Sequence, residues 1–358
     1  MTQKTTQRKS NFELLRIISM CGIIAIHYIS TDLGGMLQDP AFPNFEWLLR
    51  QFVLSTAAPL VNCFVLISGY FLITKNQFNL RKSIELLIIT GFYGTLGYFI
   101  GLYYGTASFS FKGLLYAFFP FFDGKRWFVE TYIILILIAP FINKVITNIS
   151  KKSFQALLSV QLTFFCVWYS VGQCTPVFSI NLSAPILDNG YGIINFISLY
   201  LLGAYFRLYL SESIIYKLSR IKLLLGYIVC CALNFLASYF INPFGYCFVT
   251  NILSSVFIFL LFEKTNLGYN KPINLFGAAA FDVYFIHGDS YTSRLLVQNL
   301  FQGKLFIGTL MIIPHLLISI TAFYLLGIVM YKLRSFIFEK SIDKLLNRCS
   351  VINANISV

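Results

Sequence analysis

The first long apolar segment of the chain, Asn11–Tyr28, carries ionisable side chains at regular positions. Glu13, Arg16 and His27 interrupt the run NFELLRIISMCGIIAIHY, which is otherwise apolar enough to cross a membrane. Ionisable groups are costly in hydrocarbon, so those found there are functional candidates. At about 100° and about 1.5 Å per residue, Arg16 and His27 share one helix face and lie about 16 Å apart along the axis. Glu13 precedes Arg16 by one helical turn and is its neighbour on that face.

The remainder of the chain is equally apolar. Of its 358 residues, 57% are hydrophobic and only 11% are charged, whereas soluble domains carry about 25% charged residues. The sequence therefore predicts an all-α polytopic membrane protein with about ten transmembrane helices. The expected spans are approximately 14–29, 47–73, 84–104, 127–146, 154–171, 191–210, 223–241, 244–262, 273–290 and 305–331. The aromatic stretch 106–126 is expected to be an interfacial or re-entrant segment.

The positions of Lys and Arg predict the topology. The formal net charge is +13, and most basic residues fall in alternate loops, so the positive-inside rule places both termini in the cytoplasm. We expect a cytoplasmic tail over 1–13, a transmembrane domain over 14–331 and a second cytoplasmic tail over 332–358. Because topology accounts for the charge, no nucleic acid is expected as a partner. The lipid bilayer is the expected surrounding, and cysteine spacing indicates no metal site.

The pattern of the first span resembles the integral-membrane acyltransferase 3 family, in which an acidic residue, an Arg and a His recur at this spacing. Four later segments are also similar to the family: Ser68–Gly69–Tyr70, Arg126–Trp127, the Leu-Gly-Ala-Tyr run of the sixth span, and VYFIH, which ends at His287. The resemblance implies an acetyl-CoA-dependent O-acyltransferase of the bacterial plasma (inner) membrane. Its carbohydrate acceptor would be a capsule, exopolysaccharide, O-antigen or wall glycan.

His27 is the candidate catalytic residue. A neutral imidazole can take a proton from the acceptor hydroxyl, or it can attack the thioester and hold the acyl group; the sequence leaves both routes open. The competing interpretation is a buried structural histidine. Arg16 is the candidate ligand of the coenzyme A phosphates, because a guanidinium binds phosphate in a bidentate manner. Otherwise it is a snorkelling residue paired with Glu13. Glu13 is grouped with the catalytic residues as the side chain that orients Arg16.

Further site residues depend on the resemblance. Ser68, Tyr70, Arg81 and Lys82 would help to bind the acyl donor, although helix packing and topology explain them equally well. The acceptor pocket would contain Arg126, Trp127 and His287, the last expected at a depth similar to that of His27. For Trp127 the alternative is an ordinary interface anchor.

A transporter or flippase for a lipid-linked glycan is the alternative function. It would have a similar set of spans and would use Arg16 and His27 as substrate or proton sites. Consumption of acyl-CoA separates the two, because a transporter releases no coenzyme A thiol. A signalling or purely structural membrane protein leaves the polar side chains of the first span unexplained.

Overall fold

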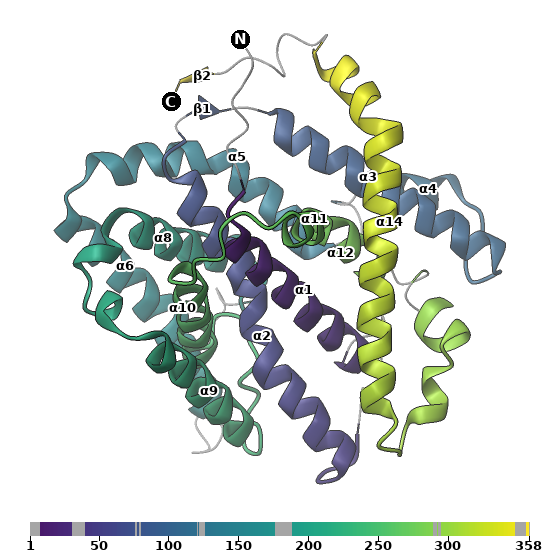
Figure 1. Ribbon diagram of the computed structural model, residues 1–358, viewed down its shortest axis with the longest axis horizontal. Coiled ribbons are helices and arrows are strands. Elements are labelled where there is room, and N and C mark those ends of the chain that lie inside the picture. Colours follow the sequence, from purple (N-terminus) through teal and green to yellow (C-terminus); the bar gives the residue numbers. More distant parts are fainter. Residues whose placement is uncertain are drawn as a thin grey trace.

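The computed structural model describes residues 8–30, 40–75, 77–78, 80–119, 121, 126–175, 188–288, 292, 295–347 and 356–357. This part of the chain is built almost entirely from helices (Figure 1). The α-helices are α1 (Ser10–Ser30), α2 (Phe45–Leu72), α3 (Arg81–Tyr103), α4 (Phe111–Phe118), α5 (Trp127–Asn148), α6 (Lys151–Leu162), α7 (Trp168–Cys174), α8 (Ile193–Tyr209), α9 (Arg220–Ala237), α10 (Val249–Glu263), α11 (Lys271–Ala278), α12 (Ala280–Gly288) and α14 (Ile312–Asn347). The π-helical turn Thr163–Val167 joins α6 to α7, and β1 (Gln77–Phe78) pairs antiparallel with β2 (Ile356–Ser357).

Eight helices of the described residues are long and apolar enough to cross a membrane, which confirms a multi-pass helical membrane protein. They correspond to spans one to seven and ten of the expected set. The eighth expected span is represented by α10, which has 15 residues, fewer than the about 20 that a bilayer requires. The ninth is divided into α11 and α12, of 8 and 9 residues. The count of ten and the cytoplasmic placement of both termini stay predictions.

Helix boundaries differ from the expected ones in the eighth, ninth and tenth spans. The start of α10 moves from residue 244 to Val249 because Pro243 and Gly245 lie in turns, where their carbonyls accept hydrogen bonds from Asn251 Nδ2. The ninth segment is interrupted at Ala279, which is not helical. The last helix begins at Ile312, after a turn in which Gly308 has a φ of 80°. It also continues to Asn347, so residues 332–347 extend the helix that the expected transmembrane domain ended at 331.

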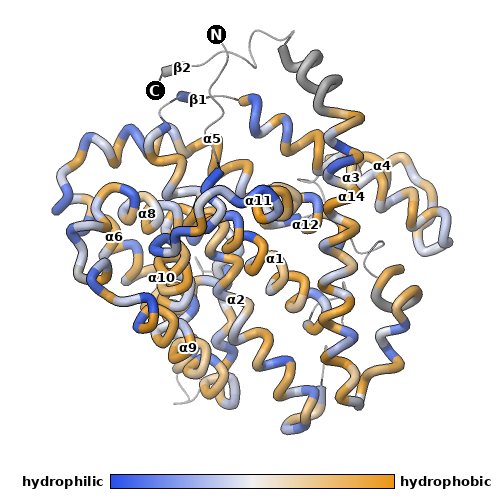
Figure 2. The backbone as a smooth tube through the Cα atoms, viewed as in Figure 1, coloured by the Kyte–Doolittle hydropathy of each residue, from blue (hydrophilic) through white to orange (hydrophobic). Residues whose placement is uncertain are grey.

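The two N-terminal helices form the centre of the molecule. In Figure 1, α1 and α2 lie between a group containing α8, α9 and α10 on one side and α14 on the other. Figure 2 shows hydrophobic residues on the outward sides of many helices as well as inside. Phe336, Leu305 and Ile221 are examples of large apolar side chains that are mostly exposed. Such a surface suits contact with lipid rather than water.

Glycines let α2 and α8 approach closely. A Cβ added at Gly69 would collide with the backbone of Tyr200, and one added at Gly203 would collide with the carbonyl oxygen of Leu66. Small residues at helix contacts are a common means of packing helices in membranes. The Ser-Gly-Tyr and Leu-Gly-Ala-Tyr segments, which lie far apart in the sequence, therefore pack against each other.

Gly69→Ala is expected to destabilise the protein by about 1–3 kcal/mol, the usual cost of overpacking a tight contact. The obstacle is backbone, which cannot move aside. Gly226→Ala is the comparison, because the atoms nearest to its added Cβ, at 2.9–3.0 Å, belong to the ring of Phe257, a side chain that can shift where backbone cannot, and alanine is the better helix former. Thermal unfolding in detergent measures both. An unchanged melting temperature in Gly69→Ala would contradict the close approach.

The segment α11–α12 runs beside α1 in the same direction. At one end, the Ser10 hydroxyl donates to Asn274 Oδ1 at 3.1 Å and accepts from the backbone N–H of Asn270 at 2.8 Å. At the other end, the rings of His27 and His287 are in contact. This parallel arrangement aligns the polar start of α1 with the start of α11, and the two histidines with each other.

Candidate functional site

The polar and cavity-lining residues of α1 form one continuous stripe. Glu13, Arg16, Met20, Ile23 and His27 follow each other at intervals of three and four residues, the spacing of one helix face. The predicted shared face of Arg16 and His27 is therefore present in a single, unbroken helix. Along this face the chain passes from charged groups at the start of α1 to an imidazole near its end.

Glu13 holds two arginines at the start of the stripe. Its carboxylate accepts from Arg16 Nη1 at 2.5 Å and from Arg8 Nη1 at 3.4 Å. The Glu13 side chain is 3% exposed, whereas that of Arg16 is 28% exposed. A Cβ at Gly277 of α11 would collide with Glu13 Oε2, so the glycine leaves room for this carboxylate. Glu13 thus fixes Arg16 while the guanidinium keeps access to the surroundings.

The two histidines expected at similar depth are neighbours. Their ring centroids lie 5.0 Å apart with an interplanar angle of 41°. The Nδ1 of His287 lies 2.6 Å from the carbonyl oxygen of Val283. A carbonyl only accepts, so Nδ1 carries the proton and Nε2 presents a lone pair in the neutral ring. That Nε2 is buried and has no hydrogen-bond partner among the described residues.

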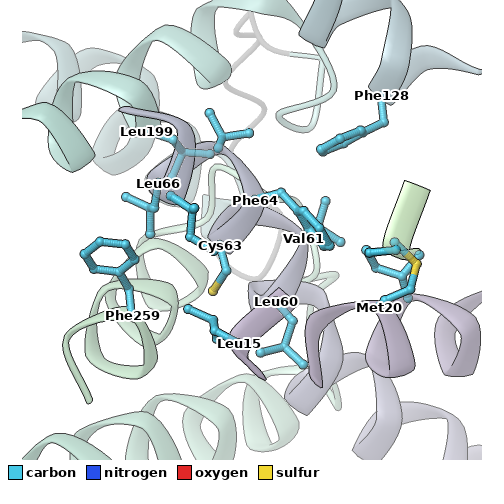
Figure 3. Close-up of a cluster of buried hydrophobic side chains, with 14 of the residues drawn as sticks. Leu15, Met20, Leu60, Val61, Cys63, Phe64, Leu66, Phe128, Leu199 and Phe259 are labelled. Carbon is cyan, nitrogen blue, oxygen red and sulfur yellow. The ribbon is translucent and has the colours of Figure 1, made fainter. Parts of the chain in front are cut away.

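A narrow cavity opens beside His27. Its volume of about 30 Å³ is sufficient for one or two water-sized groups. Helices α1, α2, α5 and α12 and the turn before α10 contribute the walls, which consist of Met20, Ile23, His27, Val61, Phe64, Trp127, Phe128, Tyr246, Phe281 and Tyr284. Figure 3 shows part of this wall, with Met20, Val61, Phe64 and Phe128 drawn as sticks. The imidazole is therefore the basic group of an otherwise aromatic and aliphatic cavity.

Aromatic rings surround Trp127, the first residue of α5. Its ring stacks on Tyr246 with centroids 5.4 Å apart and meets the edge of Tyr191 at 4.5 Å. Tyr191 is 42% exposed, so the cluster reaches from the cavity to the surface. Trp127 and His27 line the same cavity, although their helices are separate in the sequence.

Ser68 and Tyr70, expected at the donor site, are engaged in the helix core. The Ser68 hydroxyl donates to the carbonyl of Phe64 at 2.8 Å and lies 2.9 Å from the hydroxyl of Tyr132. Tyr70 is 5% exposed and packs on Phe12 with ring centroids 5.2 Å apart. Their direct contact with an acyl donor stays a prediction.

The basic residues expected at the two substrate sites differ in their surroundings. Arg81 Nε donates to Glu85 at 2.8 Å, a pair on the surface of α3, while Lys82 is exposed. Arg126 is buried, and its Nη1 donates to the carbonyl of Ala117 at 3.2 Å. Gly94 of α3 provides the space for this guanidinium. Arg126 thus contacts α3 and α4 and is not among the residues that line the His27 cavity.

A buried ion pair joins α12 to α14 near the start of α12, before His287 in the sequence. Arg334 of α14 donates two hydrogen bonds to the carboxylate of Asp282, from Nε to Oδ1 at 2.6 Å and from Nη2 to Oδ2 at 3.2 Å. The hydroxyl of Tyr93 donates to Oδ1 at 2.7 Å. Asp282 is 1% exposed. This cluster connects α3, α12 and α14 and holds the helix that carries His287.

Sequence reasoning did not identify Tyr246, Tyr284 and Phe281 as cavity residues. Phe281 and Tyr284 lie three residues apart, with His287 after three more, and this spacing on one helix face was the available signal. Tyr246 lies in a turn, where periodicity gives no information. Among the described residues, no group of three or more His, Cys, Asp or Glu side chains is arranged to hold a metal ion.

Comparison with known proteins agrees with these features. A family model described as an acyltransferase domain, of the type called acyltransferase 3, matches residues 9–332. This range runs from the start of α1 to within α14 and includes every residue of the His27 cavity. No curated protein and no solved structure gives a significant match to the chain.

Proposed function

Because the chain belongs to the acyltransferase 3 family and is a membrane acyltransferase, we propose that it transfers an acetyl group from cytoplasmic acetyl-CoA to a glycan hydroxyl. The main support is the position of His27, which lines a cavity with Trp127 and contacts His287. Arg16 lies on the same face of α1, toward its other end. A transporter would have similar spans, but it would not account for the family membership.

The reaction is the alcoholysis of a thioester, in which the acceptor hydroxyl is the nucleophile. The acceptor hydroxyl attacks the thioester carbonyl, the carbon–sulfur bond breaks, and coenzyme A leaves as its thiol while an ester forms. His27 would take the hydroxyl proton and return it to the departing thiolate. In the alternative route, the His27 imidazole first displaces the thiol and carries the acyl group, which the hydroxyl then attacks. Both routes have the same overall reaction: acetyl-CoA and a hydroxyl give an ester and coenzyme A thiol.

His287 supports this assignment as the neighbour of His27. Its protonated Nδ1 is held by the carbonyl of Val283, which fixes the ring and leaves Nε2 as an acceptor. His287 contacts the His27 ring but is not among the residues that line the cavity, so its Nε2 lone pair would act from behind His27, by accepting a hydrogen bond that orients that ring or a bound hydroxyl. Such preorganised partners contribute to catalysis because they need no rearrangement during the reaction.

The proposed paths of the two substrates follow the stripe on α1 and the aromatic cluster. Arg16 would bind donor phosphates at the charged end, and the pantetheine arm would extend past Met20 and Ile23 toward His27. On the acceptor side, the cavity has room only for water-sized groups, so the sugar ring would pack outside it, against the exposed part of the Trp127–Tyr191 cluster, and direct one hydroxyl inward. Tyr191 extends this aromatic surface outward.

Purified protein supplied with radiolabelled acetyl-CoA and candidate surface glycans tests the function. We expect coenzyme A thiol to appear in equal amount to glycan ester, and neither product to form with His27→Ala. Glycan movement across proteoliposomes without any release of thiol would instead establish the transporter.

Arg16→Ala is expected to weaken acetyl-CoA binding by about 10–100-fold, since a hydrogen bond to a charged group contributes about 1.5–3 kcal/mol. Arg16→Lys keeps the charge but loses the bidentate geometry, and we expect an intermediate affinity. Arg220→Ala, which removes an exposed arginine at the start of α9, is the control. Equilibrium binding in detergent measures all three. Equal affinity in wild type and Arg16→Ala would leave Arg16 with only its ion pair to Glu13.

A further inference from the structure

A polar hollow of about 400 Å³ lies at the start of α1, apart from the His27 cavity. One wall is the segment Arg8–Asn11, and the other consists of Glu263 and the loop from Thr265 to Tyr269. We propose that this hollow binds the phosphoadenosine end of the acyl-CoA donor, a proposal that rests on the donor assigned above. Its volume is in the range of pockets that hold ligands of this size, about 300–1,000 Å³.

The charge of the hollow suits a phosphate ester. Arg8 and Lys9 are the cations of its wall, and no ion pair of Lys9 is found among the described residues. Arg8 is 52% exposed and shares Glu13 with Arg16. Glu263 is the one carboxylate of the lining. Lys9 is therefore available to a ligand phosphate, with Arg8 beside it.

The opposite wall offers a platform for a purine base. Tyr269 is 59% exposed although its loop borders the hollow. Stacking of a base on an aromatic side chain contributes about 1–3 kcal/mol. Asn266 lies in the same wall and can hydrogen-bond the edge of the base. Cationic and aromatic groups thus face the hollow from its two sides.

Hydrogen bonds hold the two walls in a fixed relation. Asn11 Nδ2 donates to the carbonyl of Phe262 at 2.8 Å, at the end of α10. Ser10 bonds both Asn270 and Asn274 at the start of α11. The hollow is therefore formed before a ligand arrives, which lowers the entropic cost of binding.

Two contacts connect the hollow to residues already assigned to the donor. Arg8, in its wall, is joined to Arg16 through the shared carboxylate of Glu13. Phe12, which follows the lining residue Asn11, packs on the ring of Tyr70, and that ring also lies under the guanidinium of Arg207. A donor with its nucleotide in the hollow would therefore pass Arg16 before its thioester reaches His27. This order agrees with the chemical order of coenzyme A.

Direct binding of adenosine 3′,5′-bisphosphate to the full-length protein in uncharged detergent tests the proposal. We expect the bisphosphate to bind wild type and to compete with acetyl-CoA. Lys9→Ala and Tyr269→Ala should each weaken its binding about tenfold, the equivalent of about 1.4 kcal/mol. Lys271→Ala, which removes an exposed lysine next to the hollow but outside its lining, should bind as wild type does. In turnover, KM for acetyl-CoA should rise in the first two variants while kcat holds.

The outcomes separate this proposal from the function on which it rests. Bisphosphate binding that depends on Lys9 and Tyr269 supports the nucleotide site even if no glycan is acetylated. Acetyl-CoA turnover with a KM that neither variant changes would overturn the site and leave the acyltransferase function intact. Binding of phosphatidylglycerol vesicles to the wild-type protein, with no binding of the bisphosphate, would also overturn the nucleotide site. That result would assign Arg8 and Lys9 to a lipid headgroup.

Discussion

His27→Ala is expected to lower the rate of acyl transfer by about 10²–10⁴-fold, the usual contribution of a general base. Acetyl-CoA should still bind, because the charged end of α1 is about 16 Å away along the helix axis at about 1.5 Å per residue. Initial rates of coenzyme A release, together with binding of acetyl-CoA, measure the two effects separately.

The control for this substitution lies on the same helix. Ile18 is 37% exposed and points away from the stripe, so Ile18→Ala should keep activity. Labelling then distinguishes the two chemical routes: if His27 carries the acyl group, radioactivity from acetyl-CoA will attach to wild type without any acceptor. Full glycan acetylation by a folded His27→Ala protein would contradict the catalytic assignment and leave His27 with a structural role only.

Asp282→Ala is expected to destabilise the protein by about 3–5 kcal/mol, since it leaves the buried partner of an ion pair without compensation. Arg334 would lose both of its hydrogen bonds to the carboxylate, and Tyr93 would lose its acceptor. The position of α12, and with it His287, would also be less well fixed. Thermal and denaturant unfolding in detergent are the measurements.

A surface pair and a double variant sharpen this experiment. Lys151 and Glu212 form an exposed ion pair at 2.6 Å, and exposed pairs contribute little to stability because water and salt screen them, so Lys151→Ala should change little. Adding Arg334→Met to Asp282→Ala removes the stranded charge and should recover part of the stability. If Asp282→Ala unfolds no earlier than Lys151→Ala, the ion pair does not hold α12.

Local patterns in the sequence were sufficient for several features. The period of α1 predicted the common face of Glu13, Arg16 and His27, because a regular helix fixes side-chain directions from spacing alone. The i,i+4 spacing of Arg81 and Glu85 permits the ion pair that the structure shows, although Arg81 was expected at the donor site and not in this pair. Pro243 marked the turn before α10, and the expected span 244–262 began directly after it; Gly245 was a further sign of the turn, but the expected span ran through it.

Contacts between distant segments were beyond a single sequence. Nothing in the local pattern of either helix states that His27 meets His287, or that Trp127 stacks on Tyr246. These contacts follow from how the helices pack, which depends on small residues such as Gly69 and Gly277 at particular crossings. The helix break between α11 and α12 falls at an alanine, a strong helix former, so that residue itself gave no sign of the break.

The pairing of α1 with α11 and α12 has a consequence for biogenesis. A ribosome makes α1 first, and its histidine and buried carboxylate then lack the neighbours that the finished fold gives them. Those neighbours belong to α11 and α12, which emerge after nearly all other helices. The proposed reaction centre would therefore be completed late in synthesis, and we expect nascent chains that stop before α11 to be inserted in the membrane yet inactive. Until then only helices made earlier, such as α2, which also packs on α1 in the finished fold, can shelter the polar face of α1 from lipid.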